Sequence, residues 1–398
     1  MKILVFNCGS SSLKYKLFKM PDNKELAAGE AQRIGPPTAE PSRIVYRFEG
    51  GDFQTKYVPM RNHAEALQEA MRILKEKSEY SPNAIAHRLV HGGDFIKHNT
   101  LVGTTELQIL EKVRKLAPIH NPPAIETINA CAKYFSGIPQ AVVSDTAFHS
   151  TIPPVAASYA LPKKHKKTER FRKYGFHGIS HEYVVSEAAD FLKIPLSSFN
   201  CVSCHLGSGG ASLCAVQGGK SIDNTMGYSP LPGLIMSTRC GDLDPGFVMR
   251  LLSEYNFDVG AVEGLLNRKS GVLGLSGKSA DIRDIIKNAS KEGHSRDLLA
   301  MQIYLWRLKK YLGAYLAIAG GAHAVIFTDT IGESVPEVRS IVCAEMSIFG
   351  LKIDEERNKK AALPICDISA NDSAVRILVI ATNEEISIAR NAYKLLCA

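Results

Sequence analysis

Short apolar runs that end in small, polar turns recur along the chain. Residues 2–6 are apolar, residues 7–12 are mostly small and polar, and apolar positions alternate with lysines over residues 13–18. This order predicts a β-hairpin with a Gly/Ser tip. The same order returns at residues 201–216, half a chain length later. We therefore predict a weak internal duplication, in which each half contributes one such hairpin.

Helical periodicity fills the segments between these hairpins. Apolar residues recur every three or four positions in residues 64–77, 105–117 and 180–194, and the second of these segments is stopped by Pro118. A last helix is predicted to start near Asn383, with two glutamates in its first turn.

A strand, a turn and a helix are predicted close together near residue 330. Residues 324–328 form an apolar run typical of a buried strand, and residues 329–332 form the turn. Ser334 and Glu337 have the spacing of a capping box, which predicts a helix that runs to Phe349. Strands that alternate with helices in this way indicate the α/β class.

Length and apolar content set the broad class of protein. The 398 residues suffice for two domains, and 45% of them are apolar, as in ordinary globular proteins. No stretch approaches the ~20 apolar residues that a membrane span needs. The first residues lack the apolar core of a signal peptide, so we expect a cytoplasmic protein that works without a membrane.

The nine cysteines lie mostly in apolar runs, which indicates buried thiols in a reducing compartment. Residues 201–205 (CVSCH) match the pattern for haem attachment and, in part, a redox or zinc pair, but their flanks favour a buried strand. The net charge of +8 is spread over the chain without an aromatic-basic motif. Anionic substrates or a solvated surface therefore explain the charge better than nucleic acid does.

Three turns that follow apolar strands are candidates for phosphate binding, at residues 9–12, 207–210 and 329–332. Backbone N–H groups in such turns can cradle phosphate oxygens. The alternative for each is an ordinary tight turn that needs glycine. None has the spacing of a Walker A loop.

Two arginines, Arg88 and Arg239, stand in apolar or glycine-rich surroundings. A guanidinium group is costly to bury without an anionic partner, and its planar fork matches carboxylate or phosphate. The alternative is a structural ion pair. His87 and His91 have a spacing seen in zinc-binding helices, but their segment is predicted as strand and turn, which makes a zinc role improbable.

Two acidic positions and two histidines complete the local candidates. Asp145 ends an apolar strand, where ligands of α/β sheets gather, although it could equally cap a helix. Glu384 lies in a first helical turn, where the helix dipole favours a carboxylate without any catalytic role. His120 and His177 lie in predicted loops. These residues alone indicate a two-domain enzyme that handles phosphate.

Taken together, the segments resemble the acetate kinase family, part of the superfamily of sugar kinases, actin and Hsp70. The matching motifs run in one order along nearly the whole chain, at residues 6–15, 87–93, 117–123, 145–149, 173–178, 205–207, 237–245, 269–274, 281–284 and 382–385. The resemblance implies two actin-like, ribonuclease H-like domains with the active-site cleft between them. It implies an N-terminal domain of residues 1–150 plus 383–398 and a second domain of residues 151–382 that forms a homodimer interface.

The resemblance also assigns roles on the acyl side. Arg88 and Arg239 would hold the carboxylate and the transferring phosphoryl group, and His177 would bind the phosphoryl oxygens in the transition state. Asp145 would position the metal and an arginine, or act as a base. The expected further phosphate contacts are Asn7, Ser10, Ser12, Lys14, His120 and His205. The expected apolar pocket for the acyl methyl consists of Val90, Ile119, Phe176 and Pro230. The expected ligands of Mg²⁺, or of Mn²⁺ as a substitute, are Asn7, Asp145 and Glu384.

On the donor side, the resemblance implies ATP and ADP as co-substrates. The expected nucleotide-binding residues are Lys14, Gly207, Ser208, Gly209, Gly210, Asp281, Ile282, Arg283, Asp329, Thr330, Ile331 and Gly332. Two motifs depart from the family. Ser208 replaces an asparagine in a turn one residue longer, and residues 329–334 read DTIGES where the family has AGIGEN. The charge of Asp329 would be unwelcome near nucleotide phosphates unless it pairs with Arg283 or binds a ribose hydroxyl.

Three alternative functions are open. The enzyme could use pyrophosphate, converting acetyl phosphate and phosphate to acetate and diphosphate, or it could be a propionate kinase. A different class would be a nucleotide-driven binding protein of the actin or Hsp70 kind, which would not need Arg88, Arg239 and an acyl pocket.

Overall fold

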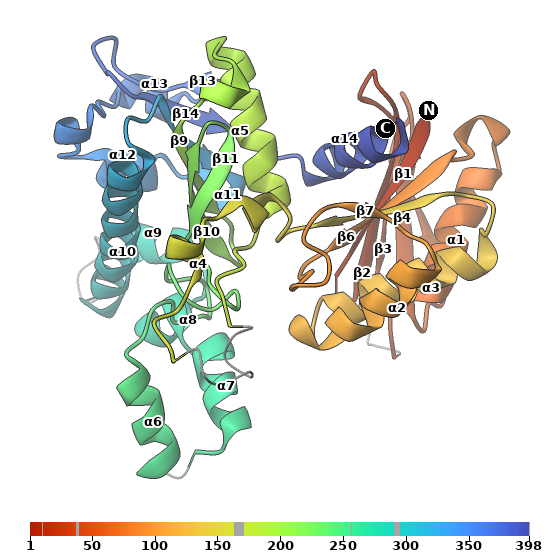
Figure 1. The fold of residues 1–398 in the computed structure, drawn as a ribbon, viewed down its shortest axis with the longest axis horizontal. Helices are drawn as coiled ribbons and strands as arrows, with labels where there is room; N and C mark the ends of the chain where they lie inside the picture. The colour runs from red at the N-terminus through yellow and green to blue at the C-terminus, as the bar shows by residue number, and fades with distance from the viewer. Residues whose placement is uncertain (10, 37–39, 163–170, 256, 290–294, 398) are drawn as a thin grey trace. The chain divides into compact units, whose positions relative to one another are not determined.

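The protein consists of two compact units. Unit 1 comprises Met1–Ser150 and Asn383–Ala398, and unit 2 comprises Thr151–Thr382. The computed structural model describes residues 1–9, 11–36, 40–162, 171–255, 257–289 and 295–397 (Figure 1).

Unit 1 is built on a mixed sheet in the order β5-β4-β3-β2-β1-β6-β8-β7. Its strands are β1 (Lys2–Cys8), β2 (Ser12–Lys19), β3 (Lys24–Gln32), β4 (Arg43–Phe48), β5 (Gln54–Tyr57), β6 (Ala84–Leu89), β7 (Thr100–Leu101) and β8 (Gln140–Ser144). Strands β1 and β2 pair antiparallel, with Asn7 opposite Lys14, so the predicted N-terminal hairpin is confirmed. On its other side β1 pairs parallel with β6, and β6 pairs parallel with β8.

Unit 2 has its own mixed sheet in the order β11-β10-β9-β12-β14-β13. Its strands are β9 (Cys201–Leu206), β10 (Ala211–Gln217), β11 (Lys220–Asn224), β12 (Ala324–Thr328), β13 (Ile365–Asp367) and β14 (Arg376–Ile380). Every residue of β9 and β12 is buried, as expected for central strands covered on both faces. The CVSCH motif therefore lies inside a buried strand.

The two sheets repeat one arrangement of five strands. In unit 1 the order is β3-β2-β1-β6-β8, and in unit 2 it is β11-β10-β9-β12-β14. In both, the first three strands are antiparallel neighbours and the last three run parallel. This repeat bears out the predicted duplication and the α/β class with two ribonuclease H-like units.

Helices cover both faces of the unit 1 sheet. They are α1 (His63–Lys75), α2 (Thr104–Val113), α3 (Asn121–Tyr134) and α14 (Glu384–Cys397). The helix predicted at residues 105–117 corresponds to α2, which ends at Val113 and is followed by a 3₁₀ turn at Arg114–Leu116. Leu4 and Phe6 of β1 share one core with α1 and α3, whereas α14 packs on β1, β6 and β8 from the opposite face (Figure 1).

Unit 2 carries more helices, and two of them extend from its body. Its helices are α4 (Pro154–Ala157), α5 (Gly178–Leu192), α6 (Pro245–Ser253), α7 (Val259–Arg268), α8 (Gly271–Ser276), α9 (Ile282–Ala289), α10 (Ser295–Ala319), α11 (Asp329–Ser334), α12 (Pro336–Cys343) and α13 (Glu355–Lys359). Helix α5 packs on β9, β12 and β14, and α10 packs on β9 and β10. Helices α6 and α7 form an arm (Figure 1). None of the helices within the described ranges is long and apolar enough to cross a membrane.

The prediction around residue 330 was partly wrong. Strand β12 has the predicted bounds, but the expected turn at residues 329–332 is the helix α11. Ser334 caps no helix, because its hydroxyl donates to the carbonyl of Thr330 at 2.5 Å within α11. Val335 separates α11 from α12, and α12 ends at Cys343 rather than at Phe349.

A buried arginine accounts for this short helix. The Arg339 guanidinium donates to the carbonyls of Gly332 (2.8 Å) and Glu333 (2.9 Å), and to Asn358 Oδ1 (2.7 Å). The carbonyls at the end of α11 are thus satisfied from the side, so the chain can break at Val335 without leaving buried acceptors unpaired.

His120 lies in a turn, as predicted, but this turn ends directly after it. It is the residue before α3, which begins at Asn121 with Pro122 and Pro123 in its first turn. Proline is tolerated there because the first N–H groups of a helix have no partner within it. The sequence was therefore interpreted as a loop where the helix had already begun.

His87 is buried inside β6. Its Nε2 lies 2.8 Å from Gln140 Oε1, which accepts only if Nε2 carries the proton, and its ring stacks on Phe6. Its Nδ1 is buried without a hydrogen-bond partner among the described residues. Burial lowers the pKa of His87 to about 4, although the bond to Gln140 opposes this shift.

This lowered pKa predicts a loss of stability in weak acid. The unfolded chain binds a proton on this residue near pH 6.5 and the folded chain only near pH 4. The contribution of His87 is thus complete above pH 6.5 and is lost as the pH falls towards 4. At pH 5 the loss amounts to about 2 kcal/mol. Calorimetric unfolding of the wild type and of His87→Gln between pH 7 and 5 checks this, since the substituted side chain does not titrate. Equal pH slopes for the two proteins would contradict it.

Candidate active site

An ion-pair cluster in unit 1 gathers around Arg88 at the end of β6. Its Nε and Nη2 donate to the two carboxylate oxygens of Asp145, at 3.0 and 2.8 Å, and its Nη1 lies 2.8 Å from Glu384 Oε2. Burial disfavours the charge of Arg88, but the two carboxylates outweigh this and raise its pKa. Asp145 follows β8 and is 1% exposed. Its carboxylate thus binds Arg88, which argues against the helix-cap alternative for Asp145.

The residues expected to hold a metal ion surround the same guanidinium. Asn7 Oδ1 accepts from Arg88 Nη1 at 3.4 Å, so Asn7, Asp145 and Glu384 all direct oxygen atoms to the same guanidinium group. Carboxylate and amide oxygens are the protein ligands that Mg²⁺ takes, usually one or two of them beside water and phosphate oxygens. The described residues contain no group of three or more His, Cys, Asp or Glu that would hold a metal unaided. The donor set fits an ion that phosphate helps to bind.

The first glycine turn joins β1 to β2 beside this cluster. The N–H of Gly9 donates to the carbonyl of Ser12 at 2.9 Å, and His63 Nε2 lies 2.9 Å from the carbonyl of Gly9. Ser12 is half-buried and Lys14 is exposed on β2. Ser10 lies outside the described residues.

The four residues expected to form the acyl pocket come from both units. In unit 1, Val90 is half-buried just after β6, and Ile119 is 57% exposed before α3, beside the half-buried His120. In unit 2, Phe176 is 1% exposed, and Pro230 is half-buried. Within unit 2, Pro230 lies next to Arg239, as described below.

Two stacked histidines mark the candidate site of unit 2. His177 precedes α5 in the left-handed region (φ 57°), and its ring stacks on His205 of β9 with centroids 4.2 Å apart. His205 Nε2 lies 3.1 Å from Asp329 Oδ2, and its Nδ1 lies 2.8 Å from the hydroxyl of Ser180. A non-glycine residue at positive φ is strained, and such strain is found at functional sites.

Arg239 has no carboxylate partner among the described residues. Its Nη1 donates to the carbonyl of Pro230 at 3.3 Å and approaches the sulfur of Met236 at 3.7 Å. Burial lowers its pKa. Because a partly buried guanidinium is stabilised by an anion, this position favours a bound carboxylate or phosphate over a structural ion pair.

Gly210 lies between Arg239 and His177. A Cβ atom added to Gly210 would be 3.4 Å from His177 Nε2 and 3.5 Å from Arg239 Nη1. The absence of a side chain therefore leaves both nitrogen atoms close to one small space in unit 2. An anion there would meet a guanidinium group and an imidazole together.

The donor-side departures from the family contact one another. Ser208 N donates to Thr330 Oγ1 at 2.9 Å, and the hydroxyl of Ser237 donates to the carbonyl of Ser208. Asp329 has a φ angle of 64°. Its carboxylate contacts His205 Nε2 and lies close to the backbone of Gly207. Asp329 does not pair with Arg283, which instead binds Asp281 through Nε (3.0 Å) and Nη2 (2.6 Å). Ile331 and Gly332 are buried within α11, Gly209 has open space around it, and Ile282 is buried in α9.

Sequence reasoning missed several polar residues behind these side chains. Ser180, His181, Ser203, Ser212 and Thr382 all make hydrogen bonds in the histidine cluster of unit 2. A serine inside a buried strand gives no local signal, because its role depends on side chains from other elements. Only the four-residue spacing of His177 and His181 could have suggested that both lie on one face of α5.

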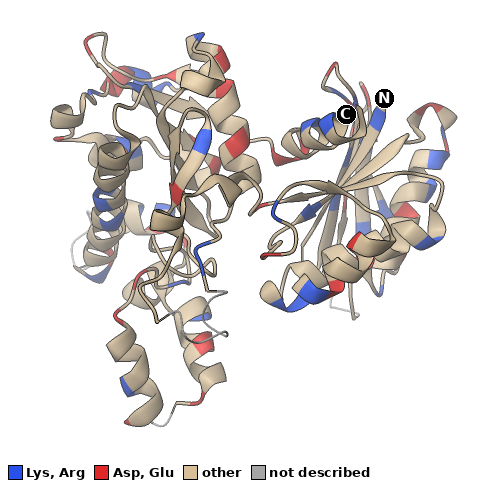
Figure 2. Cartoon of the chain, in the orientation of Figure 1, with Lys and Arg blue, Asp and Glu red and all other residues tan. Residues whose placement is uncertain are grey.

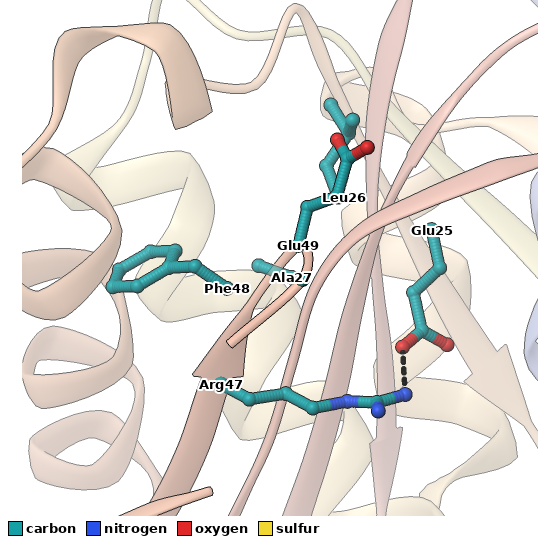
Figure 3. Close-up of a pocket in the computed structure, with 7 residues that line it drawn as sticks. Glu25, Leu26, Ala27, Arg47, Phe48 and Glu49 are labelled. Atoms are coloured by element: carbon teal, nitrogen blue, oxygen red, sulfur yellow. Dashed lines mark hydrogen bonds and ion pairs between the residues drawn. The ribbon is translucent and has the colours of Figure 1, made fainter. Parts of the chain in front are cut away.

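Two hollows are lined by residues other than the candidate residues. One, of about 280 Å³, lies along β3 and β4, where Arg47 binds Glu25 at 2.6 Å (Figure 3). The other, of about 340 Å³, is lined by Ile235, Cys240, Lys269 and Ile303, among others, next to the loop of Arg239. Lys and Arg residues are spread over the backbone of both units and interspersed with Asp and Glu (Figure 2).

Comparisons with known proteins identify the family of this chain. A model of the acetokinase family matches residues 2–390. The acetate kinase of Thermoanaerobacter pseudethanolicus is 43% identical over 403 residues, which cover 99% of each chain. The crystal structure of Porphyromonas gingivalis acetate kinase has a TM-score of 0.90 at 36% identity and covers 99% of both chains. A propionate kinase from Francisella tularensis has a TM-score of 0.88 at 35% identity over 98% of both chains. With a family model across nearly its whole length and a relative at 43% identity, this chain belongs to the acetokinase family.

Proposed function

We propose that the protein is an acetate kinase that transfers a phosphoryl group reversibly between ATP and acetate. The observation that carries the proposal is Arg239, a partly buried cation without a carboxylate partner among the described residues, beside His177. Family membership and the relatives named acetate kinase support the choice of substrate. A nucleotide-driven binding protein of the actin or Hsp70 kind would have no use for this arginine.

The reaction needs positioning and charge screening more than proton transfer. Acetate is ionised at neutral pH, so one of its oxygens can attack the γ-phosphorus directly. The new O–P bond forms as the bond to the β-phosphate oxygen breaks, and ADP leaves with that electron pair. Cations and N–H donors around the equatorial oxygens stabilise such a transition state.

Each unit would supply part of this set. In unit 2, Arg239 and His177 would bind the phosphoryl oxygens, and Pro230 and Phe176 would border the acyl methyl. In unit 1, Arg88 would bind the carboxylate. Val90 and Ile119, from the motifs at residues 87–93 and 117–123, would also border the acyl methyl. Asp145 holds Arg88 by two hydrogen bonds, so we assign it to positioning rather than to base catalysis.

Asn7, Asp145 and Glu384 would hold Mg²⁺, or Mn²⁺ in its place, together with phosphate oxygens. The ion would neutralise charge that develops on the phosphates. For Glu384 and Asp145 this role requires that they share their oxygens between the ion and Arg88. Lys14, Ser12 and the turn of residues 9–12 would line the phosphate path.

The nucleotide would be bound by unit 2, through the turn of residues 207–210, Asp281 with Arg283, and α11. ATP is the donor we favour, because the Asp281–Arg283 pair is present. Thr330 bonds Ser208 and Asp329 contacts His205, which would narrow the space for the nucleotide. We therefore expect weakened affinity for the nucleotide or a relaxed preference for its base. Pyrophosphate, which needs no adenosine pocket, is the second candidate. The likeness to a propionate kinase keeps propionate open as a substrate.

We also propose a cytoplasmic homodimer. All nine cysteines carry free thiols, and burial raises the pKa of several, such as Cys8 and Cys131, as is common in reducing compartments. Exposed apolar side chains occur on α6, α7 and α10 of unit 2. Among them are Phe247 (48% exposed), Met249 (67%), Val259 (74%), Leu299 (54%) and Trp306 (74%). Such exposure in one unit favours a self-association surface there.

The two arginines should be essential for turnover. Arg88→Ala and Arg239→Ala are each expected to lower kcat at least ~100-fold, because each removes a charge-assisted contact to the transition state. Steady-state kinetics with the hydroxamate assay for acetyl phosphate, alongside circular dichroism, measures this. Arg72→Ala, an exposed arginine paired with Glu69 and Glu76, is the control and should keep normal kcat. Normal turnover in a folded Arg239→Ala protein would refute the assignment.

The donor can be identified in the reverse direction. Acetyl phosphate breakdown is expected with ADP as acceptor and not with orthophosphate. Thr330→Gly removes the bond to Ser208 and is expected to lower the KM for ADP at least ~3-fold, with the KM for acetyl phosphate unchanged. Turnover with orthophosphate alone would overturn the nucleotide assignment and leave the acetate assignment intact.

Trp306 is the single tryptophan of the chain and reports on the proposed dimer. The wild type should sediment at twice the chain mass, and dilution should shift its tryptophan emission to longer wavelength as Trp306 becomes exposed. Phe247→Glu should sediment as a monomer, because it places a charge in the apolar surface. Phe53→Glu, at a position of similar exposure in unit 1, should remain a dimer. A wild-type monomer at micromolar concentration would disprove this association.

A further inference from the structure

A buried serine lies between two histidines in unit 2. Ser212 Oγ is 2.9 Å from His177 Nδ1 and 2.9 Å from His181 Nε2. Continuing inwards, His181 Nδ1 is 2.9 Å from Ser203 Oγ. Ser212, His181 and Ser203 are each 0% exposed. A series of hydrogen bonds, His177–Ser212–His181–Ser203, therefore runs from the candidate site into the core.

Local structure brings these four residues together. His177 and His181 are four residues apart at the start of α5, where the N–H of His181 donates to the carbonyl of His177 at 2.9 Å, so both rings lie on one face. Ser203 of β9 and Ser212 of β10 lie on neighbouring strands, in which Ser212 pairs with His205 and Ser203 with Cys214. Helix α5 packs on β9. The geometry is thus fixed by elements that the core holds rigidly.

The hydroxyl of Ser212 has only one proton to share between two ring nitrogens. If it donates to His177 Nδ1, its oxygen accepts from His181 Nε2–H, and the Ser203 hydroxyl donates to His181 Nδ1. His177 then carries its proton on Nε2. If all three bonds run the other way, His177 carries its proton on Nδ1, and the Nε2 of a neutral ring can only accept.

Phosphoryl oxygens only accept hydrogen bonds, so the two directions are not equivalent for the site. The Nε2 atom of His177 borders the space beside Gly210, which Arg239 Nη1 also borders. Only the first direction gives a neutral His177 a donor at that atom. The stacked His205, whose Nε2 contacts Asp329 and whose Nδ1 contacts Ser180, holds the ring from its face.

We propose that Ser212 is a positioning residue for His177. Supported by His181 and Ser203, it holds His177 in the Nε2–H tautomer and in the orientation that donates to the transferring phosphoryl group. This inference rests on the proposed function, because it requires that His177 act on that group. It assigns to Ser212 no contact with the substrate.

A double-mutant cycle tests the proposal. Ser212→Ala is expected to lower kcat roughly 10-fold or more, because a misaligned donor loses transition-state stabilisation, while KM values stay within ~2-fold. In a His177→Ala background, the same substitution should change kcat by less than ~2-fold, since Ser212 acts only through His177. Ser221→Ala removes another buried serine, on β11, whose hydroxyl accepts from Cys214, and should leave kcat normal.

A spectrum of the unaltered protein gives a second readout that does not depend on the folding of a variant. Protein labelled with ¹⁵N-histidine should show a His177 signal, assigned by its loss in His177→Ala, with the proton on Nε2 and none on Nδ1. A proton on Nδ1 would overturn the proposal, as would normal kcat in Ser212→Ala or equal losses in both backgrounds of the cycle. Normal kcat in folded His177→Ala would instead refute the role of His177 itself, and the role of Ser212 with it.

Discussion

A guanidinium group that is removed from water needs oxygen partners, and the arrangement of the candidate residues in each unit follows from how each buried arginine meets this need. Arg339 is bound by backbone carbonyls and Asn358, and so only holds the fold. Arg88 is held by Asp145 and Glu384. The guanidinium of Arg239 contacts one backbone carbonyl and one thioether sulfur. The series runs from fully satisfied to poorly satisfied, and the last member is the one best suited to an external anion.

Periodicity predicted those parts of the fold that depend on neighbours in the sequence. The hairpin of β1 and β2, the buried strand β9 and the helix α5 were found because their patterns are local and regular. Helix α11 was missed because it depends on Arg339 and on Glu333, whose carboxylate accepts from the N–H of Asp329. Both stabilising contacts come from side chains, and neither leaves a periodic trace.

Only part of the candidate site could be predicted from local sequence patterns in the same way. Arg88 and Arg239 stood out because charge in apolar surroundings is unusual. The sequence could not show that Arg88 is paired with carboxylates, whereas Arg239 meets none in the part of the chain that the structure describes. Ser208, Asp329 and Thr330 were recognised as three separate departures from the family. In the structure Thr330 bonds Ser208 and Asp329 bonds His205, so the departures form one connected change. Their assigned roles in binding stay predictions.

Unit 1 is discontinuous in the chain, because α14 returns to its sheet after the whole of unit 2. During synthesis, the β-strands of unit 1 therefore emerge long before the helix that covers one of their faces. Until then the apolar side of β1 and β6 lacks its cover, and Arg88 lacks the carboxylate of Glu384. Unit 2, which is continuous, can fold in that interval. The order of translation thus makes completion of the Arg88 cluster one of the last events in folding.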